Sequence, residues 1–196
     1  MKIYTRKGDA GETGLYGNVR VPKDSSRIRT YGGIDELNSL IGLALSTTPV
    51  PPVIQARLSR LQNELFQLGA ELATPRGKAV PSTVLDKPEI ERMEKEIDEM
   101  EALLPPLKTF ILPGGSPLSS WLHLARTVSR RAERDLSSLN RSEPCRAVVL
   151  QYVNRLSDYL FVLARFANHE ARVKDVPWIA PHPTGGGATH SNSASG

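Results

Sequence analysis

Hydrophobic residues recur at intervals of three and four along most of this chain, a spacing that places them on one face of an α-helix. Sustained alternation of apolar and polar residues, the pattern of a half-buried strand, does not occur. The pattern therefore predicts an all-α protein. Helices are expected over about 27–48, 53–73, 88–104 and 144–173, with a further helix from Pro117 through Leu136.

Prolines set most of the expected helix boundaries. The cluster of Pro49, Pro51 and Pro52 cannot continue the first helix, whereas Pro88 sits where the first turn of a helix accepts proline. Ser116 followed by Pro117 supplies an N-cap and a first-turn proline for the fourth helix. Five amphipathic helices with short connections indicate a five-helix bundle.

The length of 196 residues favours one domain, expected over residues 1–180. Residues 181–196 are rich in glycine, serine, threonine and asparagine, a composition that predicts a disordered tail.

Charge and composition narrow the class of protein. A net charge of +4 and an aromatic content of 6% do not favour a general nucleic-acid surface. No apolar run is long enough for a membrane span, and charged residues occupy the start of the chain where a signal peptide would be apolar. The single cysteine, Cys145, excludes an intramolecular disulfide and fits a reducing compartment. We therefore expect a cytoplasmic protein that acts on a small anionic ligand.

The first candidate for anion binding is a glycine-rich loop ahead of the helices, TRKGDAGETG at residues 5–14. Its glycines allow several backbone N–H groups to converge on one anion, and Lys7 and Lys23 can offset the anion's charge. The loop matches neither standard nucleotide-binding glycine pattern, and a plain turn or frayed end has the same composition. It needs support from elsewhere in the chain.

The second candidate is an arginine stripe on the fourth helix, formed by Arg126, Arg130 and Arg134 at spacing four. Like charges at this spacing destabilise an isolated helix, so an anion is expected to compensate them. Guanidinium groups bind phosphate through paired N–H donors, although a solvated face with partner carboxylates is the alternative. With the glycine-rich loop, the stripe favours a phosphate ligand.

Other polar residues leave more than one interpretation open. Asp35 and Glu36 flank the apolar stripe of the first helix and can pair with an arginine or with solvent. Asn154, Arg155 and Asp158 lie among the inward positions expected for the fifth helix, where a buried amide is either a hydrogen-bonded core group or a ligand contact. The four histidines have no metal-binding spacing, because the motif begun by His169 is closed by Val173.

Four blocks, in this order, resemble the PduO-type ATP:corrinoid adenosyltransferases. The match extends to about residue 173. The blocks are residues 3–9 (IYTRKGD), 31–39 (YGGIDELNS), 110–115 (FILPGG), and 130–134 (RRAER) together with 154–161 (NRLSDYLF).

The resemblance implies a five-helix bundle that forms a homotrimer, with active sites between subunits. It implies transfer of the 5′-deoxyadenosyl group of Mg²⁺-bound ATP to cobalt of reduced cob(I)alamin or a related corrinoid, with release of triphosphate. A reductase and an adenosylcobalamin-dependent enzyme are possible protein partners. The residues implied to bind ATP are Thr5, Arg6, Lys7, Gly8, Thr13, Gly14, Lys23, Arg130, Arg131, Glu133, Arg134 and Asn154, with magnesium held mainly through the phosphates.

The resemblance also implies three catalytic residues. Asp35 would form a salt bridge with Arg130 across a subunit contact, and Phe110 would press on the lower face of the corrin. Such an aromatic wedge would exclude the lower axial ligand and so ease reduction to Co(I), the nucleophile that attacks C5′ of ATP. The protein must then align C5′ with cobalt and stabilise the leaving triphosphate.

Two positions depart from the family pattern. Threonine is more usual where this chain has Lys7, and an acidic residue is more usual at Ala10. The loop is therefore more basic here, and the resemblance does not define its hydroxyl contacts with phosphate. The rival interpretations are another nucleotide-dependent transferase on the same bundle and a non-catalytic corrinoid or nucleotide carrier or sensor.

Overall fold

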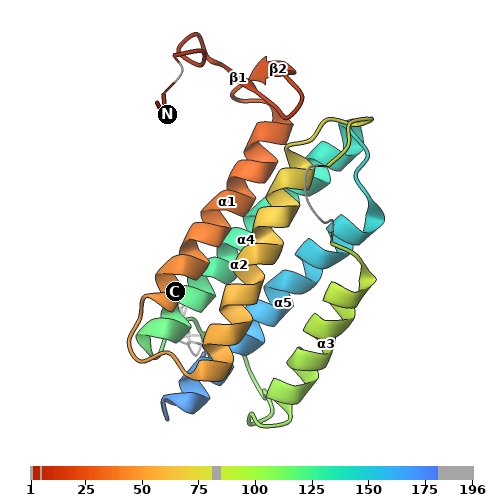
Figure 1. Cartoon of the computed structure of the whole chain (residues 1–196). Helices are drawn as coiled ribbons and strands as arrows, with labels where there is room; N and C mark the ends of the chain where they lie inside the picture. The colour runs from red at the N-terminus through yellow and green to blue at the C-terminus, as the bar shows by residue number, and fades with distance from the viewer. Residues whose placement is uncertain (1, 5, 81–84, 181–196) are drawn as a thin grey trace, which may run out of the picture.

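The computed structural model describes residues 2–4, 6–80 and 85–180. Its five helices are α1 (Ser26–Leu45), α2 (Pro52–Leu72), α3 (Lys87–Glu101), α4 (Pro117–Ser142) and α5 (Ala147–Glu170). The expected five-helix bundle is confirmed (Figure 1). The expected tail at residues 181–196 lies outside the described residues.

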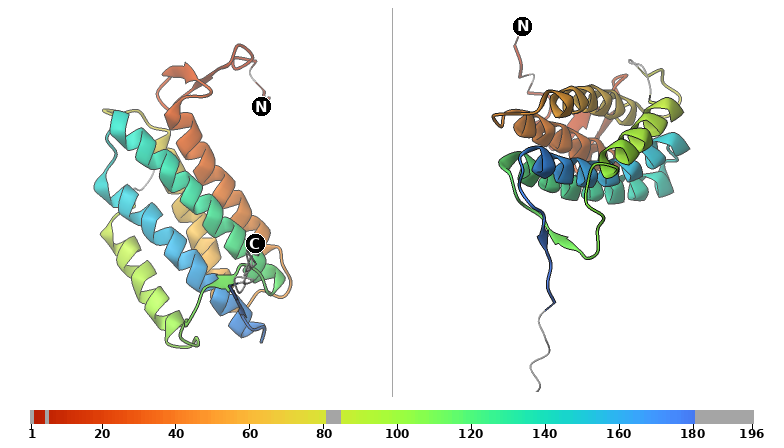
Figure 2. Two further views of the ribbon diagram at one scale, coloured as in Figure 1. Left: turned by 180° about the vertical axis from the view of Figure 1, so that it is seen from behind. Right: turned by 90° about the horizontal axis from the view of Figure 1, so that it is seen from below.

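Four of the helices form two layers, with α1 and α2 in one and α4 and α5 in the other (Figure 2). The helix α1 packs against α4 and α2, while α5 packs against α4 and α3. The apolar stripe of α2 is entirely buried, as its regular spacing predicts: Ile54, Leu58, Leu61, Leu65, Leu68 and Leu72.

Local sequence signals explain where the helices start. The Ser116 hydroxyl accepts a hydrogen bond from Ser119 N, and Pro117 occupies the first turn of α4. Asp86 and Glu89 form a reciprocal capping box at the start of α3. The third helix, expected to extend to residue 104, ends at Glu101, and Leu103 beyond it is 60% exposed.

Two small hairpins modify the all-α expectation. Strands β1 (Glu12–Gly14) and β2 (Arg20–Pro22) pair antiparallel ahead of α1. Strands β3 (Ile111–Leu112) and β4 (Val176–Pro177) pair antiparallel beside the bundle, on the side away from α1 and α2 (Figure 2). Segments of two or three residues are too short to produce a recognisable alternation in the sequence.

The turn before α4 is fixed by close packing against α5. Gly115 has a φ of 110°, and a Cβ at this position would collide with the Asn168 carboxamide. That carboxamide accepts from Ser116 N at 2.9 Å and donates to Gly114 O at 3.0 Å. The glycines of the FILPGG block therefore let the chain approach α5 and place Phe110 outside the bundle.

Candidate functional site

The N-terminal loop folds back on its own hairpin. Lys23 N donates to Gly11 O at 2.9 Å, and a Cβ on Gly8 would lie 3.3 Å from Lys23 Nζ. Arg6 and Gly11 have φ values of 57° and 82°. The loop thus brings Gly8 and Lys23 together in a tight turn suited to an anion. Thr5 lies outside the described residues.

Two predicted members of the loop are in the hairpin itself. Thr13 pairs with Val21 and is half-buried, and Gly14 pairs with Arg20. The Arg20 guanidinium also donates to the carbonyl oxygen of Lys7 at 2.6 Å. The side chains of Arg6, Lys7 and Lys23 remain exposed and can meet an incoming ligand.

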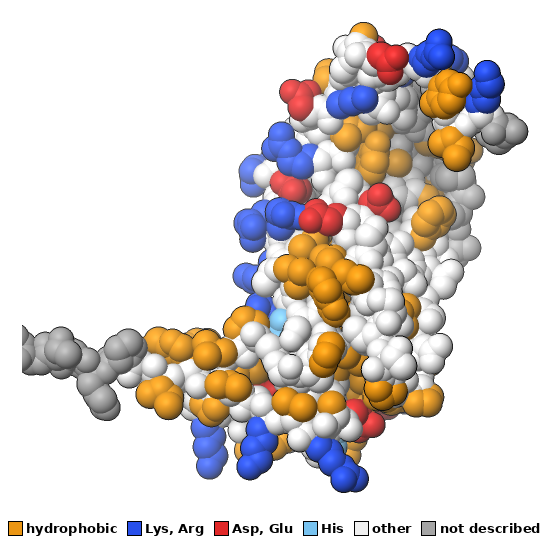
Figure 3. Space-filling view, turned by 90° about the vertical axis from the view of Figure 1, so that its left-hand side faces the viewer, with side chains coloured by type: hydrophobic (Ala, Val, Ile, Leu, Met, Phe, Trp, Pro, Cys, Tyr) orange, Lys and Arg blue, Asp and Glu red, His pale blue; other side chains and the backbone are white. Residues whose placement is uncertain are grey.

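The arginines of α4 lie along one edge of the α1–α4 face. Figure 3 shows basic side chains in a column there, beside acidic and hydrophobic groups. Arg130 and Arg134 are exposed, and Arg134 donates to the carbonyl oxygen of Arg130 at 3.1 Å. Arg131 forms an ion pair with Glu36 of α1. Within the chain, Arg131 is therefore partly neutralised.

Glu133 and Asn154 connect α4 to α5. The Asn154 amide donates to the Glu133 carboxylate at 2.9 Å, which supports their prediction as neighbours in one site. The prediction that Asn154, Arg155 and Asp158 point inward is wrong: Asn154 and Asp158 are exposed, and Arg155 is half-buried in ion pairs with Glu94 and Asp158. They occupy the flank of α5, where a ligand can reach Asn154.

Asp35 is exposed on α1. Among the described residues, its carboxylate forms no ion pair within 4.0 Å, whereas the adjacent Glu36 pairs with Arg131. The expected salt bridge between Asp35 and Arg130 is thus not formed within one chain.

The two groups of predicted ATP ligands belong to separate parts of the chain. Strands β1 and β2 contact each other and no helix, and they sit at the end of the bundle where α1 begins (Figure 1). Arg130, Arg134 and Asn154 lie on the sides of α4 and α5. Within the part of the chain that the structure describes, no contact joins these strands to α4 or α5.

Phe110 lies next to a pocket of about 450 Å³, here called the Phe110 pocket. Its ring is 81% exposed, and its carbonyl oxygen accepts from Trp178 N at 2.8 Å, which extends the β3–β4 pairing. The pocket is lined by Leu107, Thr109, Phe110, Ile111, Pro113, His123, Arg126 and Phe161. An exposed aromatic ring held on a short hairpin can press on a flat ligand.

The Phe110 pocket includes His123, which the sequence-based site omitted, and Arg126, which the sequence analysis named only as part of the arginine stripe. His123 is 3% exposed, and neither of its ring nitrogens has a hydrogen-bond partner. Burial, and then the charge of Arg126, lower the pKa of His123 and keep the ring neutral at pH 7. The available signal was a lone histidine on the apolar stripe of α4, beside an arginine already noted for its spacing.

Arg126 joins the Phe110 pocket to a second hollow. Its buried Nε has no hydrogen-bond partner, and burial followed by the charge of Arg130 lowers the pKa of the guanidinium. It lines both the Phe110 pocket and a neighbouring hollow of about 420 Å³ that also contains Arg130 and Asp158. A half-buried, incompletely paired guanidinium favours the approach of an anion.

Comparison with known proteins identifies the family. The family model described as cobalamin adenosyltransferase matches residues 3–167. A corrinoid adenosyltransferase of Bacillus subtilis (strain 168) is 46% identical over 181 residues, covering 91% of this chain and 92% of the relative. The chain belongs to the cobalamin adenosyltransferase family.

Two further relatives agree with this assignment. A cobalamin adenosyltransferase of Cupriavidus metallidurans (strain CH34) is 46% identical over 177 residues, with 90% of this chain and 94% of the relative covered. A variant PduO-type ATP:corrinoid adenosyltransferase from Lactobacillus reuteri, complexed with cobalamin and ATP, superposes with a TM-score of 0.86 at 38% identity. That superposition covers 90% of this chain and 99% of the other.

Two kinds of feature are relevant in this member of the cobalamin adenosyltransferase family: metal-binding clusters and membrane-spanning helices. In the part of the chain that the structure describes, no three His, Cys, Asp or Glu side chains cluster to hold a metal ion. Over the same residues, no helix is long and apolar enough to cross a bilayer.

Proposed function

We propose that this chain transfers the 5′-deoxyadenosyl group of ATP to the cobalt of a reduced corrinoid at a site that combines the Phe110 pocket with the α4 arginines. Corrinoid adenosyltransferase activity follows from the family and from close relatives over nine-tenths of the chain. The observation that carries the site is Phe110, an exposed ring on a pocket lined by buried His123, whose ring nitrogens have no partners, and by Arg126, whose buried Nε has none.

The corrin is proposed to lie with its lower face against Phe110. An aromatic ring at this position occupies the space of the lower axial ligand and of water, which favours a cobalt without a lower ligand. Such a cobalt accepts an electron more readily, and the resulting Co(I) is the nucleophile. Neutral His123, set back in the pocket wall, can donate one hydrogen bond to the substrate without adding charge.

The triphosphate is proposed to bind Arg130 and Arg134, with Glu133 and Asn154 beside them. As Co(I) attacks C5′, the bond from C5′ to the phosphate oxygen breaks and negative charge grows on the leaving triphosphate. Positioned guanidinium groups stabilise that charge more in the transition state than in bound ATP. Mg²⁺ would be held mainly by phosphate oxygens, with Glu133 the nearest proposed protein carboxylate, since this ion commonly combines one or two carboxylates with phosphates and water.

A homotrimer would unite the two separated groups of ATP ligands. The glycine-rich loop of one subunit, with Gly8 and Lys23, would close over the α4 arginines of its neighbour. Asp35 of one subunit would pair with Arg130 of the next, which supplies the carboxylate that the single chain does not offer. The exposed positions of Asp35 and Arg130 support this arrangement.

The deciding experiment is anaerobic. The protein is mixed with ATP, Mg²⁺ and chemically reduced cobalamin, and loss of Co(I) absorbance is followed together with triphosphate release. Equal amounts of adenosylcobalamin and triphosphate are expected. Binding of both ligands without product would instead identify a carrier or sensor, and triphosphate release without a cobalt–carbon bond would identify a different nucleotide-dependent enzyme.

A further inference from the structure

His123 is a buried side chain of α4 that lacks hydrogen bonds among the described residues. It is 3% exposed, and neither Nδ1 nor Nε2 has a partner in that part of the chain. The ring lies in the wall of the Phe110 pocket, where Phe161 meets it edge-on with the ring centroids 6.1 Å apart. Unpaired buried nitrogens cost free energy in the folded chain. A group that enters the pocket can recover that cost by pairing with the imidazole.

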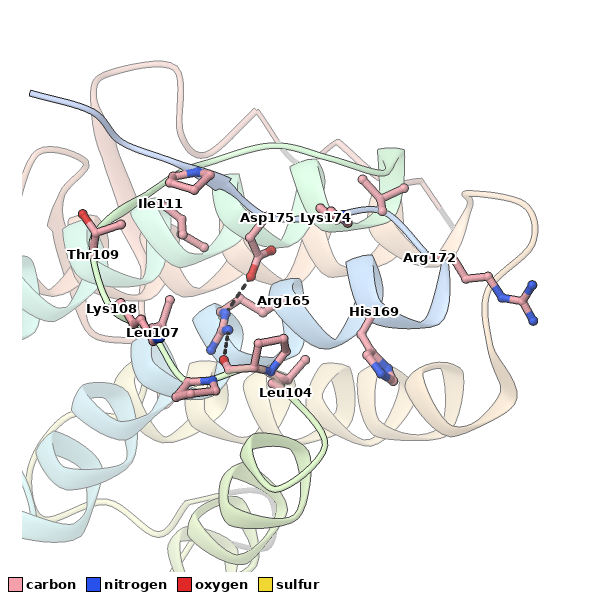
Figure 4. Close-up of a pocket in the computed structure, with 14 residues that line it drawn as sticks. Leu104, Leu107, Lys108, Thr109, Ile111, Arg165, His169, Arg172, Lys174 and Asp175 are labelled. Atoms are coloured by element: carbon pink, nitrogen blue, oxygen red, sulfur yellow. Dashed lines mark hydrogen bonds and ion pairs between the residues drawn. The ribbon is translucent and has the colours of Figure 1, made fainter.

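The carboxylate whose charge acts on this ring is engaged elsewhere. Asp175 opposes the lowering of the pKa of His123 but forms no hydrogen bond with it among the described residues. Instead, the Asp175 carboxylate accepts from the Arg165 guanidinium at 2.8 Å (Figure 4) and from the Asn168 amide at 3.2 Å. Open hydrogen-bonding positions therefore remain in the wall of the Phe110 pocket, on the ring nitrogens of His123 and on the Nε of Arg126.

The chemistry of these open positions favours a ligand group that both donates and accepts. Burial and the charge of Arg126 lower the pKa of His123 and keep its ring neutral, with one N–H donor and one bare nitrogen. The same charge favours the tautomer whose bare nitrogen lies on the side of Arg126. A carboxamide on that side can donate to the bare nitrogen and accept from Arg126. An ionised carboxylate only accepts, so it leaves the bare nitrogen unpaired.

We propose that His123 distinguishes an amidated corrin from one that has a carboxylate at the same position. A propionamide of the substrate enters the Phe110 pocket, donates an N–H to His123 and accepts from Arg126 Nε through its carbonyl oxygen. This inference rests on the proposed function, because it needs a corrinoid on Phe110. Corrinoids such as cobalamin carry propionamide chains that project from the lower face, which is the face proposed to meet that ring. The pocket of about 450 Å³ exceeds the volume of one such chain.

The surroundings of His123 add to the penalty against a carboxylate. Apart from Thr109, His123 and Arg126, the Phe110 pocket is lined by apolar side chains, and an ionised group loses hydration among them. A carboxylate gains the attraction of Arg126 but leaves a buried nitrogen of His123 unpaired, whereas a propionamide pairs with both residues. His123 is thus a specificity-determining residue that contacts the periphery of the substrate.

The test compares amide and acid forms of one corrinoid. Dissociation constants are measured by visible absorption, with ATP and Mg²⁺ present, for cob(II)alamin and for its isomeric monocarboxylic acids, in each of which one lower-face propionamide is hydrolysed. Wild type is expected to bind at least one acid about tenfold more weakly than cob(II)alamin, since a buried hydrogen bond is lost. His123→Leu should weaken cob(II)alamin about tenfold and bind that acid and the amide within about twofold of each other.

Two further variants separate hydrogen bonding from packing. His123→Gln keeps a donor and an acceptor and should recover the affinity for cob(II)alamin to within about threefold of wild type. The matched control is Ser129→Ala, because Ser129 is a fully buried residue of α4 whose hydroxyl has no partner and which does not line the Phe110 pocket. It should leave every constant within about twofold. In urea denaturation of the ligand-free protein, His123→Leu should not lower the midpoint, since it removes unpaired buried nitrogens.

Three results would overturn the proposal. Wild type could bind every acid as tightly as cob(II)alamin or more tightly, which would leave recognition to the charge of Arg126. The penalty for the acid could be the same in wild type and in His123→Leu. A lower urea midpoint for His123→Leu with unchanged affinity for cob(II)alamin would assign the residue to the fold. These affinities need no turnover, so failure of wild type to adenosylate reduced cobalamin would instead refute the proposed function.

Discussion

Two polar regions of this bundle use arginine in opposite ways. Between α2, α3 and α5, an acidic–arginine cluster joins Arg57, Arg60 and Arg92 to Glu64 and Glu96. Glu64 is 7% exposed and accepts from Tyr152 at 2.8 Å, and Glu96 accepts from Tyr159 at 2.5 Å. Arg57 Nη1 and Arg60 Nε lack hydrogen-bond partners there, but both guanidinium groups form ion pairs. On α4, by contrast, Arg126 has a buried nitrogen without a partner and forms no described ion pair.

The difference separates residues that hold the fold from residues that await a ligand. In the acidic–arginine cluster, each guanidinium meets a carboxylate of the same chain, so the charges attach α3 to the bundle. On α4, Arg131 alone among Arg126, Arg130, Arg131 and Arg134 forms a described ion pair. Repulsion and incomplete pairing on α4 are what an anionic substrate can relieve.

The strongest way to break this comparison is to disrupt the paired region. Glu64→Ala removes the partner of Arg60 and Arg92 and leaves the buried Tyr152 hydroxyl unsatisfied, which should lower the free energy of unfolding by about 3 kcal/mol. Urea denaturation measures the loss. The control is Glu99→Ala, which removes an exposed carboxylate of α3 that pairs with Arg57 and Lys95. This change should lower the free energy of unfolding by well under about 1 kcal/mol. If Glu64→Ala lowers the free energy of unfolding no more than Glu99→Ala does, the buried ion pairs contribute little to stability.

The next change acts on the unpaired region. Arg134→Ala should weaken turnover with ATP by about 2 kcal/mol, because a phosphate contact is lost, and leave the free energy of unfolding nearly unchanged. Steady-state kinetics and urea denaturation provide the two readouts. Arg141→Ala, on the last turn of the same helix, is the matched control. A rate equal to that of wild type would remove Arg134 from the site.

Phe110→Ala should reduce turnover with cob(II)alamin under reductant about tenfold, while ATP affinity stays within about twofold of wild type. The ring is 81% exposed, so its removal should hardly affect folding. The visible spectrum should lose the four-coordinate cob(II)alamin species. Persistence of that species at full activity would contradict the proposed role of Phe110.

Asp35→Asn tests whether the missing partner comes from another subunit. Loss of the carboxylate should weaken subunit association or corrinoid binding several-fold, with an effect of about 1 kcal/mol. Sedimentation at several protein concentrations and corrinoid titration measure the two quantities. Ser39→Ala, one turn further along α1, serves as the control. Unchanged assembly and affinity would argue against the proposed salt bridge.

The smallest expected effect is a pH dependence of the paired region. Burial alone would raise the pKa of Glu96, but hydrogen bonds from Arg60 and Tyr159 outweigh it and lower that pKa. The stabilisation is therefore complete above the unfolded pKa and is lost as the pH falls through the folded pKa. Glu96→Gln should be less stable at pH 7 and lose less further stability on acidification than wild type. Parallel stability curves would contradict this.

The sequence by itself determined the helices and most of their ends. These helices are marked by local signals, namely the apolar spacing of α2, the N-cap Ser116 and the prolines at helix starts. Such signals can be recognised in the sequence without knowledge of the fold. The FILPGG block likewise marked Phe110 as unusual, because an apolar segment bounded by glycines fits neither an exposed loop nor a helix.

Only the tertiary structure decided which polar residues face one another. Asn154 is expected to point inward yet is exposed, and its amide donates to Glu133 of α4 at the flank of the bundle. The resemblance assigns both the glycine-rich loop and the α4 arginines to ATP, but within one chain the loop's hairpin makes no described contact with α4. The position of Phe110 depends on the pairing of β3 with β4, which joins the segment after α3 to the segment after α5. Helical periodicity is a property of a few consecutive residues, whereas burial and pairing depend on contacts between segments far apart in the chain.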